Sequence, residues 1–119
     1  RIDRPDFVAI MEGEENREEM LDIFIEDTTK ELSGMRDAFS AGNYEKLGYI
    51  IHKAAPLWAI IRINIPLGEL EKMASMPLEK WDRTLDKRIE KLLEAVEQTI
   101  EKAKRLKEKA DGNYIDSRR

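Results

Sequence analysis

Apolar residues recur at spacings of three and four along most of this chain, which is the pattern of amphipathic helices. No stretch alternates apolar and polar residues between turn signals, as a half-buried strand would. The pattern predicts helices over about residues 6–11, 16–41 and 44–63, a short helix opened by Pro66, and a long last helix that starts between residues 78 and 82 and ends near residue 110. We therefore expect an all-α fold.

Glycine, asparagine and proline separate these helices. Gly42 tolerates a positive φ just past one helix, and Asn43 is a good N-cap for the next. The expected inward stripe of residues 16–41 is Met20, Ile23, Phe24, Thr28, Met35, Ala38 and Phe39. Three long helices and a short one bury such stripes most simply as an antiparallel four-helix-type bundle, here with a short extra N-terminal helix. Trp81 is expected to close one end of the bundle.

The length of 119 residues fits one domain. We expect the bundle to occupy residues 1–110 and a flexible tail or linker to occupy residues 111–119. The first residue is arginine, which suggests a piece of a longer protein.

Composition excludes several function classes. A net charge of −4 argues against nucleic acid, which is normally bound by a basic surface. No apolar run approaches the roughly 20 residues that span a bilayer, so we expect no membrane contact by this domain. The absence of cysteine excludes disulfides and thiolate metal sites and fits the cytoplasm. We expect neither a metal site nor a cofactor.

The one histidine, His52, is the candidate reactive residue. At 100° per residue it lies beside buried Ile51, on the shoulder between the core and solvent. Its neighbours on that shoulder include Gly48, Pro56 and, two turns on, Ala59, which leave space for a partner. A neutral imidazole is nucleophilic near pH 7 and suits reversible phosphoryl transfer. The ordinary alternative is a boundary histidine with no chemical role.

The sequence around His52 resembles the histidine phosphotransfer family. The segment from Phe24 to Lys53 reads FIEDTTKELSGMRDAFSAGNYEKLGYIIHK. It contains a helix with Phe and aliphatic residues, a Gly-Asn turn, and a histidine nine residues later that follows an apolar pair. The resemblance extends from Met20 to Met73.

This resemblance implies a helical phosphocarrier. His52 would accept a phosphoryl group from the aspartate of a receiver domain and donate it to another. The domain would be a carrier and not an enzyme by itself, and its parent would be a bacterial hybrid two-component sensor histidine kinase. The expected partner is a receiver (response regulator) domain. We expect a monomer, because a histidine exposed on a helix shoulder needs no second subunit.

The chain departs from the common family motif after the histidine. That motif has Lys at the third following position and Gly at the fourth, where this chain has Ala55 and Pro56. Lys53 follows the histidine directly and is the candidate substitute for the missing lysine, although a plain surface lysine would look the same. Tyr49 is the candidate docking side chain one turn earlier. The order His-Lys-apolar-apolar-Pro is similar to a subgroup in bacterial hybrid kinases.

The sequence pattern can be compared with three other kinds of helical protein. The histidine helix of a dimerising kinase normally has an acidic residue after the histidine and a proline one place later than Pro56, so it does not fit. A di-iron bundle needs repeated Glu-x-x-His pairs, and Tyr49 stands where the glutamate would be. A noncatalytic helical protein–protein interaction module, in which His52 is incidental, stays open.

Overall fold

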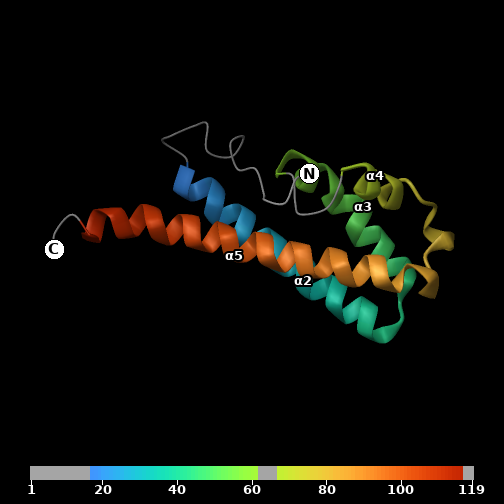
Figure 1. The fold of residues 1–119 in the computed structure, drawn as a ribbon. Helices are drawn as coiled ribbons and strands as arrows, with labels where there is room; N and C mark the ends of the chain where they lie inside the picture. The colour runs from blue at the N-terminus through green and yellow to red at the C-terminus, as the bar shows by residue number, and fades with distance from the viewer. Residues whose placement is uncertain (1–16, 62–66, 117–119) are drawn as a thin grey trace.

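Helices form all of the regular structure in the part of the chain described by the computed structural model, residues 17–61 and 67–116. They are α2 (Arg17–Ala41), α3 (Tyr44–Ile61), α4 (Leu67–Ala74) and α5 (Asp86–Asp116), with the short 3-10 helices η2 (Leu78–Lys80) and η3 (Arg83–Leu85) before α5 (Figure 1). The all-α prediction is confirmed. The helix predicted over residues 6–11 lies outside the described residues.

The long helices α2 and α5 pack against each other, and α2 also packs against α3. Helix α3 also contacts α4 and η2. Figure 1 shows α3 and α4 together at the end of the molecule where α5 begins. Ion pairs connect these helices at the surface: Arg36 of α2 lies 2.7 Å from Glu97 of α5, Asp22 of α2 lies 2.8 Å from Lys107 of α5, and Arg88 of α5 lies 2.9 Å from Glu69 of α4. Exposed pairs of this kind add little stability, so apolar packing holds the helices together.

The turn between α2 and α3 has the predicted structure. Gly42 has a φ of 72°, a left-handed conformation that glycine adopts without a Cβ clash. The Asn43 N–H donates to the Ala38 carbonyl at 2.8 Å, and the Asn43 side-chain oxygen accepts from the Lys46 N–H at 3.2 Å. These bonds satisfy a carbonyl at the end of α2 and an N–H at the start of α3, which helix ends otherwise leave without partners. They stabilise the turn that connects the two helices.

The buried stripe of α2 differs in part from the prediction. Met20 and Ile23 are 43% and 47% exposed, so their assignment to the core was wrong. Leu21 and Leu32 are buried instead, beside the correctly predicted Phe24. Consecutive residues of a helix point in directions about 100° apart. The buried stripe runs through Leu21 and not through Met20, so Met20 and Ile23 lie at its edges. The remaining predicted members Thr28, Met35 and Ala38 are buried and Phe39 is half-buried.

The last helix begins later and ends later than predicted. Asp82 is extended, and its carboxylate accepts from the Thr84 N–H at 3.0 Å and from the Thr84 hydroxyl at 2.6 Å. This side-chain bonding favours a turn over a continuous helix, so η3 precedes α5. At its other end α5 continues beyond Ala110 to Asp116.

Candidate functional site

His52 lies half-buried on α3, and one of its ring nitrogens is held by the backbone. Its Nε2 is 2.9 Å from the carbonyl oxygen of Met76, in the segment between α4 and η2. A carbonyl oxygen can only accept a hydrogen bond, so Nε2 is the donor. In the neutral imidazole the proton therefore sits on Nε2, and the lone pair belongs to Nδ1.

The Met76 carbonyl is available because Pro77 interrupts the helical hydrogen-bond pattern. The Met76 N–H still donates to the Met73 carbonyl at 3.2 Å, in a last turn after α4. Pro77 is extended, with φ −59° and ψ 144°, and its own carbonyl accepts from the Lys80 N–H at 2.9 Å. A residue before proline is disfavoured from continuing a helix, so the Met76 carbonyl is left without a helical donor. His52 supplies one.

Trp81 lies beside His52 and is almost fully buried, with 4% of its surface exposed. The two rings meet edge to face, with centroids 6.4 Å apart and planes at 60°. The indole also packs directly on Gly48, because a Cβ at that position would lie 2.9 Å from three indole ring atoms. Gly48 therefore allows Trp81 to approach the backbone of α3 one turn before His52.

The predicted site residues fall into two groups. Tyr49, Lys53 and Pro56 are exposed, and together with half-buried Ala59 they form the outer surface of α3 on either side of His52. Gly48 is buried, and the space it leaves is filled by Trp81 of the same chain. The expectation that Gly48 leaves this space for a partner therefore needs correction.

Lys53 lies within electrostatic range of a half-buried carboxyl on α2. Burial raises the pKa of Glu31, and the negative charge of Asp27 raises it further, whereas Lys53 opposes both effects. The Glu31 Oε1 is buried with no hydrogen-bond partner among the described residues. The ammonium of Lys53 therefore experiences the field of α2 as well as that of any group bound at His52.

Three groups at the site were not predicted as part of it: the Met76 carbonyl, Trp81 and Glu31. A backbone carbonyl is present in every residue, so only the following Pro77 hints that this one is free. The sequence also predicts that Trp81 is buried, but it does not predict the contact between Trp81 and Gly48.

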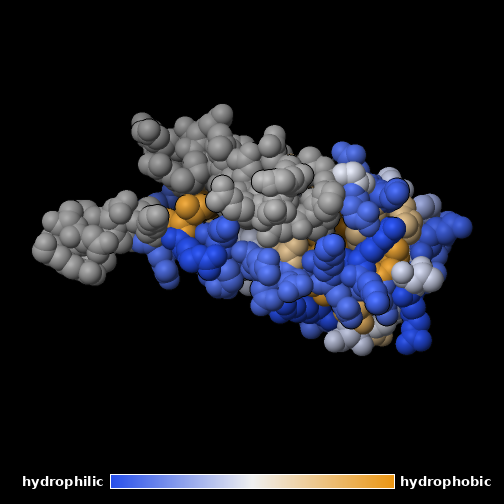
Figure 2. All heavy atoms as spheres, in the orientation of Figure 1, coloured by the Kyte–Doolittle hydropathy of each residue, from blue (hydrophilic) through white to orange (hydrophobic). Residues whose placement is uncertain are grey.

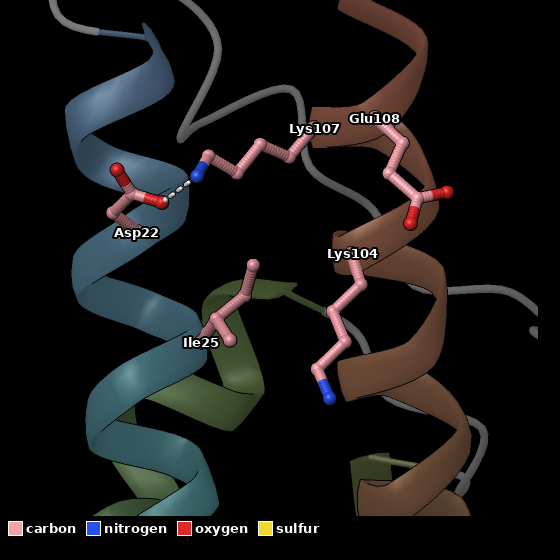
Figure 3. Close-up of a pocket in the computed structure, with 5 residues that line it drawn as sticks. All are labelled: Asp22, Ile25, Lys104, Lys107 and Glu108. Carbon is pink, nitrogen blue, oxygen red and sulfur yellow. Dashed lines mark ion pairs between the residues drawn. The ribbon is translucent and has the colours of Figure 1, made fainter. Parts of the chain in front are cut away.

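A separate hollow lies between α2 and α5. It has a volume of about 280 Å³ and is lined by Asp22, Ile25, Lys104, Lys107 and Glu108, with Asp22 and Lys107 paired at 2.8 Å (Figure 3). None of the predicted site residues line it. On the face drawn in Figure 2, hydrophilic residues dominate the described part of the surface, and apolar atoms show in smaller areas between them.

Two searches for other features gave negative results. Among the residues described, no three or more His, Cys, Asp and Glu side chains are grouped to hold a metal ion. None of the described helices is long and apolar enough to cross a membrane. Comparisons with protein families, with curated proteins and with solved structures found no match for this chain.

We predict that Gly48→Ala destabilises the chain by about 1–3 kcal/mol, because the added Cβ overlaps the buried indole of Trp81. Urea denaturation measures the free energy of unfolding. Gly34→Ala is the matched control: its Cβ would meet only the end of the Ile50 side chain, at 3.3 Å, which can move. In a double-mutant cycle with Trp81→Leu, the cost of Gly48→Ala should fall. Equal effects of the two glycine substitutions would contradict the close contact.

We predict that Glu31→Gln raises stability at neutral pH relative to the wild type. Because the pKa of Glu31 is raised in the folded state, its contribution is most favourable below the ordinary glutamate pKa and is lost as pH rises through the folded value. The gain from Glu31→Gln should therefore grow over that window. Denaturation curves across the acid range measure it, with Glu94→Gln on the exposed face of α5 as the control for losing one carboxylate. A gain in the free energy of unfolding that does not change with pH would contradict the raised pKa of Glu31.

Proposed function

We propose that this chain is a histidine phosphotransfer domain, an antiparallel four-helix-type bundle that carries a phosphoryl group on His52 between receiver-domain aspartates. The observation that carries the proposal is the state of the imidazole: half-exposed on α3, fixed by the Met76 carbonyl, and left with one nucleophilic nitrogen. A phosphocarrier needs such a positioned nucleophile and little more, because the receiver supplies most of the charge that stabilises the transition state.

The exposed residues around His52 suit docking of another protein. Tyr49 is 58% exposed, which gives an aromatic contact surface, and Lys53 and Pro56 flank the histidine on its other side. Aromatic side chains contribute a large share of the binding energy at protein interfaces. Lys53 adds a positive charge that would attract the phosphoryl group and the acidic residues that surround a receiver aspartate.

His52→Gln should abolish phosphoryl transfer while leaving the chain folded. The glutamine amide can still donate to the Met76 carbonyl but is not a nucleophile. The wild type and the variant are incubated with a panel of phosphorylated receivers, and base-stable, acid-labile label is measured. Circular dichroism and the thermal midpoint confirm folding. Equal label on both proteins would refute His52 as the site, and no label on either would favour the noncatalytic interaction module.

Lys53→Ala should slow transfer several-fold, up to about tenfold, which corresponds to about 1.4 kcal/mol of transition-state stabilisation. The exposed ammonium is adjacent to His52 in sequence, and its loss removes positive charge near the transferring group. Lys91→Ala, on the exposed surface of α5, is the matched control and should leave the rate unchanged. Rapid-quench kinetics with one receiver measure both. An unchanged transfer rate for Lys53→Ala would indicate that Lys53 is an ordinary surface lysine with no part in the transfer.

A further inference from the structure

We propose that residues 76–81 form a latch that holds His52 in the free chain and must open before the imidazole takes a phosphoryl group. This inference rests on the proposed function and adds a conformational step to it. The latch lies between α4 and η3 and includes η2. It meets the imidazole at the bond between His52 Nε2 and the Met76 carbonyl, which is 2.9 Å long.

The latch occupies the end of the imidazole ring that a partner protein reaches first. Nδ1 is bonded to the ring carbon that carries Cβ, so it lies next to the histidine's own helix, whereas Nε2 is on the far side of the ring. A receiver aspartate belongs to a second folded domain, and two folded surfaces come closest at groups that protrude from them. In this structure the protruding nitrogen of His52 is bonded to the Met76 carbonyl. A receiver can reach it only after that carbonyl has moved away.

The latch also determines which ring nitrogen has the lone pair. A carbonyl oxygen only accepts hydrogen bonds, so the latched neutral ring carries its proton on Nε2. Once the carbonyl has moved, the proton exchanges through water between the two nitrogens, and a lone pair becomes available on Nε2. The neutral ring has one nucleophilic nitrogen in both arrangements. Opening the latch allows that nitrogen to be the one that faces the partner.

Transfer to the ring of the open latch balances in atoms and charge. The Nε2 lone pair attacks the phosphorus of the receiver's aspartyl phosphate, the N–P bond forms, and the bond from phosphorus to the carboxylate oxygen breaks. The electron pair of that bond stays on the aspartate carboxylate, and the ring proton stays on Nδ1. The phosphoryl group then stands in place of the Nε2–H that the Met76 carbonyl accepted, so the latch stays open while His52 is phosphorylated.

The latch is attached to α3 mainly at its two ends, which makes local opening possible. The Met76 carbonyl bonds to His52 at one end, and the Trp81 indole packs on Gly48 at the other. The backbone bonds from the Lys80 N–H to the Pro77 carbonyl and from the Trp81 N–H to the Leu78 carbonyl join latch residues to one another. These bonds survive when the latch moves as a unit, so opening does not require the chain to unfold.

The test variant is Pro77→Gly in the whole 119-residue chain. Glycine releases the φ angle that proline holds at −59° and so favours the open latch. Two rates are measured: carbethoxylation by diethyl pyrocarbonate, for which His52 is the only histidine, and phosphoryl transfer from a phosphorylated receiver. We expect both to rise by the same factor, roughly two- to fivefold. In 15N NMR the Nε2–H tautomer should lose population.

A second variant and a control accompany this test. Trp81→Phe shortens the ring that packs on Gly48, so it should also speed both reactions, with circular dichroism confirming the fold. Ser75→Ala is the matched control, because the Ser75 hydroxyl bonds to the Lys72 carbonyl, outside the latch. This control should keep the wild-type rates.

The outcomes separate the latch from the proposed function. Unchanged or slower phosphoryl transfer in both Pro77→Gly and Trp81→Phe, with label present on wild-type His52, would overturn the latch and leave the proposed function intact. Faster carbethoxylation in the variants, with no phosphoryl label on any folded chain, would overturn the proposed function and with it the part of the latch in transfer.

Discussion

The close packing of the Trp81 indole on Gly48 is the contact on which the site depends. A side chain at position 48 would collide with the ring, so the indole rests directly on the backbone of α3. Trp81 also ends η2, with its N–H bonded to the Leu78 carbonyl at 3.1 Å. The indole therefore anchors the segment from Met76 to Trp81 across α3, and this placement brings the Met76 carbonyl to His52.

The energetics of this contact and of the histidine hydrogen bond support each other. Burying an indole removes on the order of 200 Å² from water, which favours the closed arrangement of the segment. That arrangement would leave the Met76 carbonyl without a donor in a partly buried place, at a cost of about 1–3 kcal/mol, if His52 did not supply one. His52 therefore has a structural role, because its Nε2–H satisfies the carbonyl, and the same bond assigns the lone pair of the neutral ring to Nδ1.

Much of the fold follows from the sequence because it depends on local patterns. The spacing of apolar residues predicts the helices, and Gly42 and Asn43 predict the turn between two of them. The inward face of α2 was predicted less well, since Met20 and Leu21 are both apolar and only the position of the neighbouring helices decides which is buried. The late start of α5 depends on the Asp82 carboxylate bonding to Thr84, which competes with a helix that the periodicity alone allows.

The site shows why a small residue is difficult to interpret from sequence. Gly48 could equally leave space for a partner or admit a side chain of its own chain, and residue 81 is too distant in sequence for periodicity to relate the two. Exposed Tyr49, Lys53 and Pro56 could be predicted because their exposure follows from their angle on one helix. The tautomer of the neutral His52 ring could not be predicted, because it depends on the Met76 carbonyl, which Pro77 leaves without a helical donor. Chemistry determined by a backbone group thus becomes visible only when the fold has brought distant segments together.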